Sequence, residues 1–500
     1  MSATAATAPE ERGIRYWMER VMVERQRVGA EFAVDPVHDL RVALRRCRAI
    51  AEGMRTVDPD PRWRRMRRAA KVLFSSLGEL RDVQVLEEWA QSLGKDGDPV
   101  KARLLAYFAT REAELKVHAA EVLAEFDVER WQRWAGVLDG RLREHAIDTQ
   151  VFEVVALEKL VAASELRKTA ARTRSKTALH GVRIGLKRLR YVVENFLAEH
   201  HERWRGDLKL LQDVLGEVHD LDVLWVTALK MRCFASVEDR ERWREAITQA
   251  RGERVAIYKS RLGGRDSLLR KWRDELPAGD ELREAIAKKF QTWAGFLDAD
   301  PAHSARVEQS SVALYDRLLA LDVVKDVTLD EVSARELLRT AAMTRAVGGC
   351  DGKMDRERAA RRIERLGVPT GWQAEHVRMI GYIVRCQSGR PPFEEPLFRR
   401  MAQRKQRVVI LLGGILRLAE AVAASAPHVQ VDLEREKGFL LLRAEGCSRP
   451  EKLAAASYVL ETALGMPIMV NSPMPARRAA AGGVRARVAK ARSTKPRPRK

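Results

Sequence analysis

Residues 38–48 read His38-Asp-Leu-Arg-Val-Ala-Leu-Arg-Arg-Cys-Arg48, and residues 180–190 repeat the pattern as His180-Gly-Val-Arg-Ile-Gly-Leu-Lys-Arg-Leu-Arg190. In an α-helix, each histidine and the positions three, seven and ten residues after it lie within an arc of about 80°. In both copies those positions carry arginine or lysine, whereas the apolar residues two, six and nine positions on take the opposite side. Each stretch therefore predicts a helix that packs by one face and presents a row of cations on the other.

The row of cations has two interpretations, an anion-binding face or an ordinary solvated face. A solvated helix face normally mixes both signs of charge, because opposite charges four residues apart attract. Between each histidine and the last arginine of its stretch the only acid is Asp39, which lies off the row. Adjacent cations repel one another unless an anion neutralises them. Because the arrangement occurs twice, we favour anion binding.

A second motif is duplicated as well. Leu77-Gly-Glu-Leu-Arg-Asp-Val-Gln-Val-Leu86 recurs as Leu215-Gly-Glu-Val-His-Asp-Leu-Asp-Val-Leu224, and aligning the copies pairs Lys71 with Lys209. A repeat with a spacing of about 140 residues indicates duplicated domain halves rather than a short-period solenoid. We predict two helical bundles that face each other across a pseudo-twofold axis, with the two rows of cations lining a shared channel.

The doubled His-x-x-Arg and Leu-Gly-Glu motifs resemble the CHAD family (conserved histidine α-helical domain) over roughly residues 10–275. The resemblance implies a pair of helical bundles around a basic pore that binds inorganic polyphosphate without catalysis. By this resemblance the polyphosphate ligands would be His38, Arg41, Arg45, Arg46, Arg48 and Lys71 in one half, and His180, Arg183, Lys187, Arg188, Arg190 and Lys209 in the other. Arginine suits phosphate, which it binds with two parallel hydrogen bonds.

Four residues of these motifs also have structural interpretations. For His38 and His180, a hydrogen bond at the start of a helix is as good an interpretation as a ligand role. Asp82 and Asp220 have no nucleophile beside them in the motif. We expect these carboxylates to orient basic side chains or to cap a helix, and not to act in catalysis.

Composition sets the broad class. The 500 residues carry a formal net charge of +21, which favours a polyanionic partner. The five cysteines form no Cys-x-x-Cys pair, so neither a disulfide framework nor a zinc site is predicted. The N-terminus lacks the features of a signal peptide, and the longest apolar run, residues 408–416, is too short to span a membrane. We expect a cytoplasmic protein, and the family resemblance suggests association with polyphosphate granules.

The predicted fold is mainly α, with two pseudo-symmetric helical bundles and a second helical domain that ends in a small β-hairpin around Lys437-Gly438. The predicted segments are a disordered leader (1–10), the CHAD-like domain (11–275, with halves 11–148 and 149–275), the second domain (280–469) and a disordered basic tail (471–500). The tail has no aromatic residues among its cations, so base stacking is not expected.

The second domain resembles the C-terminal helical, HD-like domain of the exopolyphosphatase / guanosine pentaphosphate phosphatase family. The resemblance rests on Ala302-His-Ser-Ala-Arg-Val307, Leu337-Leu-Arg-Thr-Ala-Ala-Met343 and Leu416-Arg-Leu-Ala-Glu420. Where that family carries metal ligands, this chain has Arg345, Arg358 and Gln387. The resemblance therefore implies that the metal site is lost. An anion-binding surface or a solvated helix face would account equally well for these two arginines together with Arg361, Arg362 and Arg365.

These observations favour a non-catalytic polyphosphate-binding protein, with no cofactor, no metal and no membrane association. One alternative is a polyphosphate-processing phosphohydrolase or its regulator, although the sequence has no P-loop and no intact HD pair. A second alternative is nonspecific nucleic-acid binding, which would depend on the basic tail. The sequence predicts no particular oligomeric state.

Overall fold

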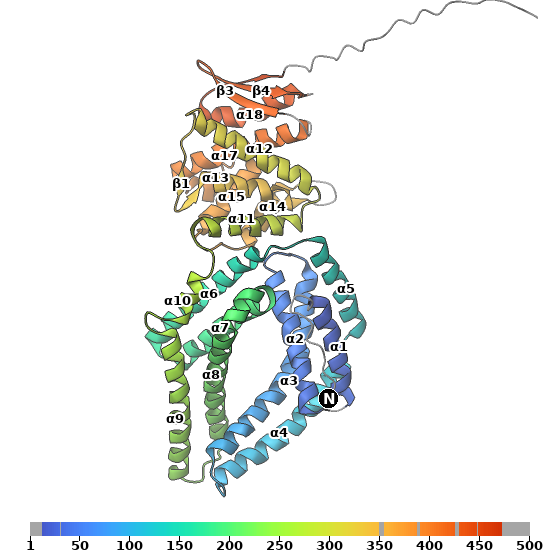
Figure 1. Cartoon of the computed structure of the whole chain (residues 1–500), viewed down its shortest axis with the longest axis vertical. Helices are drawn as coiled ribbons and strands as arrows, with labels where there is room; N and C mark the ends of the chain where they lie inside the picture. Colours follow the sequence, from blue (N-terminus) through green and yellow to red (C-terminus); the bar gives the residue numbers. More distant parts are fainter. Residues whose placement is uncertain are drawn as a thin grey trace, which may run out of the picture.

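The computed structural model describes residues 13–30, 32–349, 355–387, 391–425, 430–447 and 449–472. The predicted leader, Cys350 and residues 473–500 of the predicted tail lie outside the described residues. The chain is mainly helical, as predicted. Figure 1 shows two arms of long helices below, drawn in blue and green, and a second helical body above them, drawn in yellow to red.

The two arms have matching elements. The first half contains α1 (Ile14–Ala30), α2 (Val34–Met54), α3 (Pro61–Leu93), α4 (Pro99–Ala124) and α5 (Val128–Glu144). The second half contains α6 (Thr149–Thr173), α7 (Lys176–Phe196), α8 (Ala198–Lys230), α9 (Val237–Leu262) and α10 (Leu268–Asp274). Helices α2 and α7 both have 21 residues, α3 and α8 both have 33, and α4 and α9 both have 26. Equal lengths in the same order agree with the duplication predicted from the two motifs.

Local capping explains where several of these helices begin. Asp60 accepts a hydrogen bond from the backbone N–H of Arg62 at 2.7 Å, and Ser175 caps α7 in the same way through Ala178. The pair Asp35-Pro36 predicts Asp35 as the N-cap of α2. This prediction is wrong, because the helix begins two residues earlier, after Ala33, without a side-chain cap. Asp35 and Pro36 lie in the first turn, where backbone N–H groups have no partner within the helix and proline is tolerated.

The two halves share one core and touch along equivalent helices. Buried apolar residues from Ile14 to Leu276 form a continuous cluster. Helix α2 packs against α7, and α3 packs against α8. Equivalent helices of the two halves are therefore in contact. The duplicated basic stretches lie on one of these pairs, α2 and α7.

The second domain is built from shorter elements. Its helices are α11 (Gly279–Gly295), α12 (Pro301–Ala320), α13 (Ala334–Thr344), the 3₁₀ helix η2 (Arg345–Gly348), α14 (Arg356–Arg365), α15 (Ala374–Cys386), α16 (Pro396–Arg399), α17 (Gln403–Ser425) and α18 (Pro450–Leu464). Its strands are β1 (Thr328–Leu329), β2 (Val332–Ser333), β3 (Gln430–Arg435), β4 (Leu440–Glu445) and β5 (Ile468–Asn471).

Two features of this domain differ from the sequence prediction. The predicted hairpin is confirmed as β3 and β4, but β5 adds a third strand parallel to β4 that was not predicted. The sequence of residues 396–425 also predicts a single helix, but the segment is broken into α16 and α17. The Gln406 side chain donates hydrogen bonds to the carbonyl groups of Phe398, Arg399 and Met401, and these bonds satisfy the end of α16.

Helix α11 joins the two domains. It packs against α6 of the first domain and α13 of the second. A small apolar cluster of Val154, Ala285, Ile286 and Phe290 lies between them. Beside it, the nearly buried Lys289 Nζ lies 2.6 Å from Glu158 Oε1. The two domains therefore contact each other through a packed junction.

Helix α17 is the one helix in the described part of the chain that is long and apolar enough to span a membrane. Of its most apolar stretch, 67% is buried. It packs against α12, α15 and α18 in the core of the second domain.

Candidate functional site

The duplicated basic helices are oriented as their sequence pattern predicts. The apolar positions Leu40, Leu44 and Cys47 of α2 are fully buried, and so are their counterparts Val182, Leu186 and Leu189 of α7 within 1%. Burying these positions turns the opposite face of each helix away from its own bundle. Because α2 packs against α7, several cations of the two halves come together.

A cavity of about 220 Å³ lies between α2, α3, α6 and α7. Its lining includes six cationic side chains: Arg45, Arg48, Arg67, Lys159, Lys187 and Arg188. Among the described residues the lining includes one carboxylate, Glu52, which is already paired with Arg67 at 2.8 Å. The cavity therefore has a large excess of positive charge, drawn from both halves of the duplication.

Several arginines here are partly buried without a matching acceptor. Arg41 and Arg48 lie over the ring of Phe74, with Cζ 5.0 and 4.5 Å from the ring centroid. Burial lowers the pKa of both guanidinium groups. Arg41 Nη1, Arg45 Nε and Arg48 Nε are buried and find no hydrogen-bond acceptor within the described part of the chain. Buried donors without acceptors are costly, so an anion that accepts from them would bind favourably.

The pKa of Lys187, which also lines the cavity, is strongly shifted. Burial, followed by repulsion from Arg183, Arg45, Arg41 and Arg48, lowers the pKa of its ammonium group to about 8. A lysine surrounded by arginines loses its proton more easily than usual, and an anion in the cavity would reverse that effect. Lys187 therefore connects anion binding to pH.

The two motif carboxylates lie near these cations. Burial raises the pKa of Asp220 to about 6, and Arg183 opposes this shift. Asp82 is exposed and attracts Arg41. Both carboxylates lie within long helices, α3 and α8, so neither caps a helix end. Their attraction to Arg41 and Arg183 agrees with the alternative prediction, that they orient basic side chains.

Two of the predicted ligands are engaged elsewhere. Arg46 Nη2 lies 2.5 Å from Glu194 Oε1, and Arg190 Nε lies 3.6 Å from Glu194 Oε2. Arg46 also covers the ring of Trp17, and Arg190 donates a hydrogen bond to Gln212. Glu194 is only 7% exposed, so these contacts form a buried ion-pair cluster that ties α2 to α7 and α8. The structure thus places Arg46 and Arg190 outside the lining of the cavity.

Arg41 and Arg183 are partly buried but are not in the lining of the cavity, and the other four predicted ligands are exposed. His38 is 70% exposed and lies 3.4 Å from Asp39, while Lys71 and Lys209 are exposed on α3 and α8. His180 is exposed, with its ring centroid 4.9 Å from that of His219. None of these four residues belongs to the lining of the cavity. They lie on the same helices and face the solvent.

Sequence reasoning missed four cationic or aromatic residues of the lining. Arg67 was one of several arginines on its helix, and nothing in the motif singled it out. Phe74 and Tyr191 are aromatic residues that the helix pattern assigned no role, yet Tyr191 lies beside Arg45 and Arg48. Lys159 lies on α6, outside both motifs. Only its position next to α7 in the folded chain brings it to the cavity.

The second domain separates the arginines that the sequence grouped together. Arg345 is buried at 4% exposure, whereas Arg361 and Arg365 are exposed on α14. Arg362 donates a hydrogen bond to the carbonyl of Val347, and the backbone N–H of Arg358 is capped by Asp355. These five arginines therefore do not form one surface. In the described ranges, no group of three or more His, Cys, Asp or Glu side chains is arranged to hold a metal ion.

The fold and the cavity define a duplicated, all-helical domain with a cationic site between its halves. Residues 18–229 match the family model of the CHAD domain. A solved structure, the CHAD domain from the plant Ricinus communis, is 22% identical; the match covers 55% of this chain and 93% of that chain, with a TM-score of 0.36. No curated protein matches the chain.

Proposed function

We propose that the chain binds inorganic polyphosphate, without catalysis, in the cavity between α2 and α7. The observation that carries the proposal is the meeting of cations from both halves around a space with a single paired carboxylate among the described lining residues. The buried, unpaired nitrogens of Arg41, Arg45 and Arg48 need an acceptor that the described side chains do not supply. Phosphoryl oxygens are strong acceptors for such nitrogens.

Polyphosphate suits this site better than a single small anion does. The cations continue beyond the cavity through Arg41 and Arg183, which both act on Lys187. A linear polyanion that follows such a row releases counterions at each contact, so its affinity grows with the number of contacts. We further propose that the second domain extends or regulates this binding, and that the protein acts at polyphosphate granules in the cytoplasm.

The proposal is tested by competition at near-physiological salt. Labelled long-chain polyphosphate is bound to the full chain and to a variant that lacks residues 473–500, and excess duplex DNA or RNA is added. Truncation after Ser472 keeps β5 intact. We expect both proteins to retain polyphosphate against the nucleic acids, because the cavity does not depend on the tail. Loss of most binding in the truncated protein would instead favour nonspecific binding by the tail.

The same samples test the enzymatic alternative. Polyphosphate is incubated with the full chain and a divalent metal, and released orthophosphate is measured. We expect none above the background of a heat-denatured sample. Steady release of terminal phosphate would contradict the non-catalytic proposal.

Binding should strengthen as the pH falls, in two steps. Between pH 9 and pH 7, Lys187 regains its proton, because its pKa lies at about 8 in the free protein and rises when phosphate approaches. If polyphosphate restores the ordinary lysine pKa, this step increases affinity about tenfold. Below pH 7, Asp220 is neutralised around its pKa of about 6, which removes a repulsive charge.

The two steps are separated by conservative variants, with affinity measured from pH 5 to pH 9. Lys187→Arg keeps a permanent charge and should flatten the profile above pH 7. Asp220→Asn should flatten it below pH 7 and leave the upper step in place. A wild-type profile that is level from pH 7 to pH 9 would show that Lys187 is not close to bound phosphate.

A further inference from the structure

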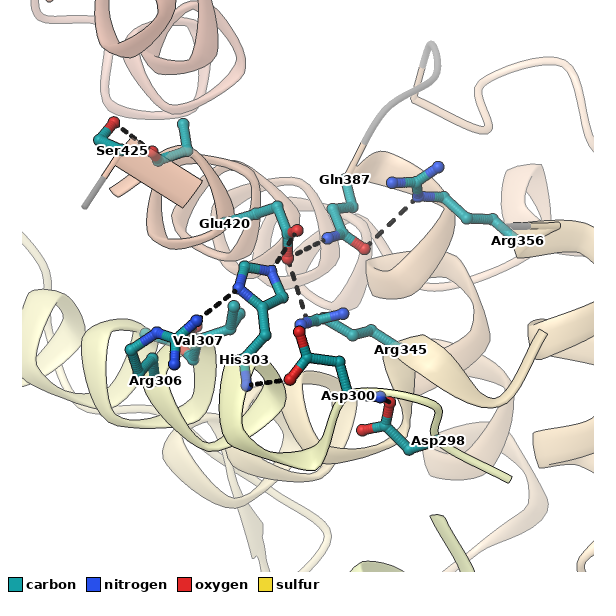
Figure 2. Close-up of polar contacts among 12 residues, drawn as sticks. Asp298, Asp300, His303, Arg306, Val307, Arg345, Arg356, Gln387, Glu420 and Ser425 are labelled. Carbon is teal, nitrogen blue, oxygen red and sulfur yellow. Dashed lines mark hydrogen bonds and ion pairs between the residues drawn. The ribbon is translucent and has the colours of Figure 1, made fainter. Parts of the chain in front are cut away.

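The second domain contains a polar cluster of its own, which shares no helix with the lining of the cavity. Five elements contribute to it: α12 with His303, η2 with Arg345, α14 with Arg356, α15 with Gln387 at its end, and α17 with Glu420. Figure 2 shows His303, Arg345 and Gln387 around the carboxylate of Glu420, with Arg356 joined to Gln387. Gln387 and Arg345 are two of the positions where the sequence resemblance implies lost metal ligands.

Glu420 is the centre of the cluster. Its Oε1 lies 2.8 Å from His303 Nε2, and its Oε2 accepts a hydrogen bond from Gln387 Nε2 at 2.8 Å. The same Oε2 lies 3.1 Å from Arg345 Nε. The oxygen of the same Gln387 amide accepts a hydrogen bond from Arg356 Nε at 3.4 Å. A single carboxylate is therefore shared by an imidazole, an amide and a guanidinium group.

Arg345 is the residue that these contacts leave incompletely satisfied. It is 4% exposed, and its Nη2 has no hydrogen-bond partner among the described residues. A guanidinium group offers five N–H donors, and the ion pair with Glu420 lies at Nε. Burial lowers the pKa of Arg345, and Glu420 opposes this shift. A buried cation with an unpaired terminal nitrogen lacks an acceptor at that point.

Arg356 adds a second cation to the same place. Burial lowers the pKa of Arg356, and repulsion from Arg345 and Arg417 acts in the same direction, while Glu420 opposes it. Arg356 and Arg345 both reach the Gln387–Glu420 pair, one from α14 and one from η2 (Figure 2). The chain thus holds two guanidinium groups at one hydrogen-bonded pair, with Arg345 on the carboxylate of Glu420 and Arg356 on the amide of Gln387.

We propose that Arg345 and Arg356 form a second binding site, which takes a single phosphoryl group. Guanidinium groups offer the paired donors that match phosphate oxygens, and they repel a metal cation. The deep burial of Arg345 favours a small ligand over a long chain. Two ligands offer such a phosphoryl group: free orthophosphate and the terminal phosphate of a short polyphosphate. This inference goes beyond the function proposed for the cavity, because it concerns another domain and another ligand size.

The experiment measures orthophosphate binding by isothermal titration calorimetry. The protein is the full chain carrying Arg45→Glu and Lys187→Glu, so that binding in the first domain is suppressed. Added to this background are Arg356→Gln, or Arg361→Gln as the matched control on the exposed face of the same helix. We expect saturable binding that Arg356→Gln weakens at least about tenfold and that Arg361→Gln leaves unchanged. Circular dichroism confirms that the variants are folded.

The outcomes divide clearly. No saturable orthophosphate binding in the background protein, or equal binding by the two added variants, overturns the site. Binding of Mn²⁺ in place of orthophosphate overturns it too. Tripolyphosphate distinguishes the sources: tighter binding than orthophosphate, with the same loss in Arg356→Gln, assigns the site to a chain end. Failure here leaves the cavity unaffected, because long-chain binding by the wild-type protein is measured separately.

A second measurement needs no variant. The wild-type chain is treated with phenylglyoxal, which modifies arginine, and the modified peptides are quantified by mass spectrometry with and without orthophosphate. We expect phosphate to protect Arg356 and to leave Arg361 equally reactive in both samples. Equal reactivity of Arg356 with and without phosphate would contradict the proposal even if Arg356→Gln did not fold.

Discussion

Replacing Arg45 and Lys187 together by glutamate should lower the affinity for long-chain polyphosphate by about 100-fold or more at near-physiological salt. The two residues come from different halves, and both line the cavity. The change removes two cations and adds two anions where the polyphosphate would lie. The fold should survive, because Arg48, Arg67 and Arg188 remain in the lining to neutralise the new carboxylates.

The control for this double variant changes the net charge equally at a distance from the cavity. Arg130 and Arg143 lie on α5 with side chains 59% and 71% exposed, and each is paired with an aspartate on its own helix or at its start. Arg130→Glu plus Arg143→Glu should alter the affinity by less than about threefold, since exposed charges are largely screened by salt. If both double variants lose affinity equally, polyphosphate binds through the overall charge of the protein and not through the cavity.

Replacing Glu194 by glutamine should destabilise the protein by about 3 kcal/mol without changing the affinity of the folded protein for polyphosphate. Glu194 is 7% exposed and faces both Arg46 and Arg190. Removing its charge leaves two partly buried guanidinium groups without their carboxylate, and such a loss costs more than the ion pair itself contributes. The measurement is urea unfolding, followed by circular dichroism, together with polyphosphate titration of the folded variant.

Glu202→Gln provides the comparison for Glu194→Gln. Glu202 is 68% exposed and pairs with Arg205 on the same helix. Its loss should change the free energy of unfolding by less than about 0.5 kcal/mol. A Glu194→Gln variant as stable as Glu202→Gln would show that the Arg46 and Arg190 contacts are not structural, and these two arginines would again be candidates for the phosphate site.

The duplicated helical architecture and the buried faces of its central helices could be predicted from local sequence patterns. The apolar positions of α2 and α7 recur at helical spacing, and a chain in water must bury them, so all six are buried. The hairpin around Lys437-Gly438 followed from local patterning in the same way. The parallel strand β5 could not be predicted in this way, because it depends on pairing with β4, which precedes α18. The break within residues 396–425 depends on the folded position of the Gln406 side chain, which donates a hydrogen bond to the carbonyl of Phe398.

Which cations form the cavity was decided only by the tertiary structure. Arg45 and Arg46 are neighbours of the same chemistry, yet Arg45 lines the cavity and Arg46 binds Glu194. Adjacent residues point about 100° apart on a helix, so the packing of α2 against α7 selects the partner of each. Lys159 likewise enters the lining from α6, outside both motifs. A sequence pattern specifies the face of a helix, whereas long-range packing specifies what that face meets.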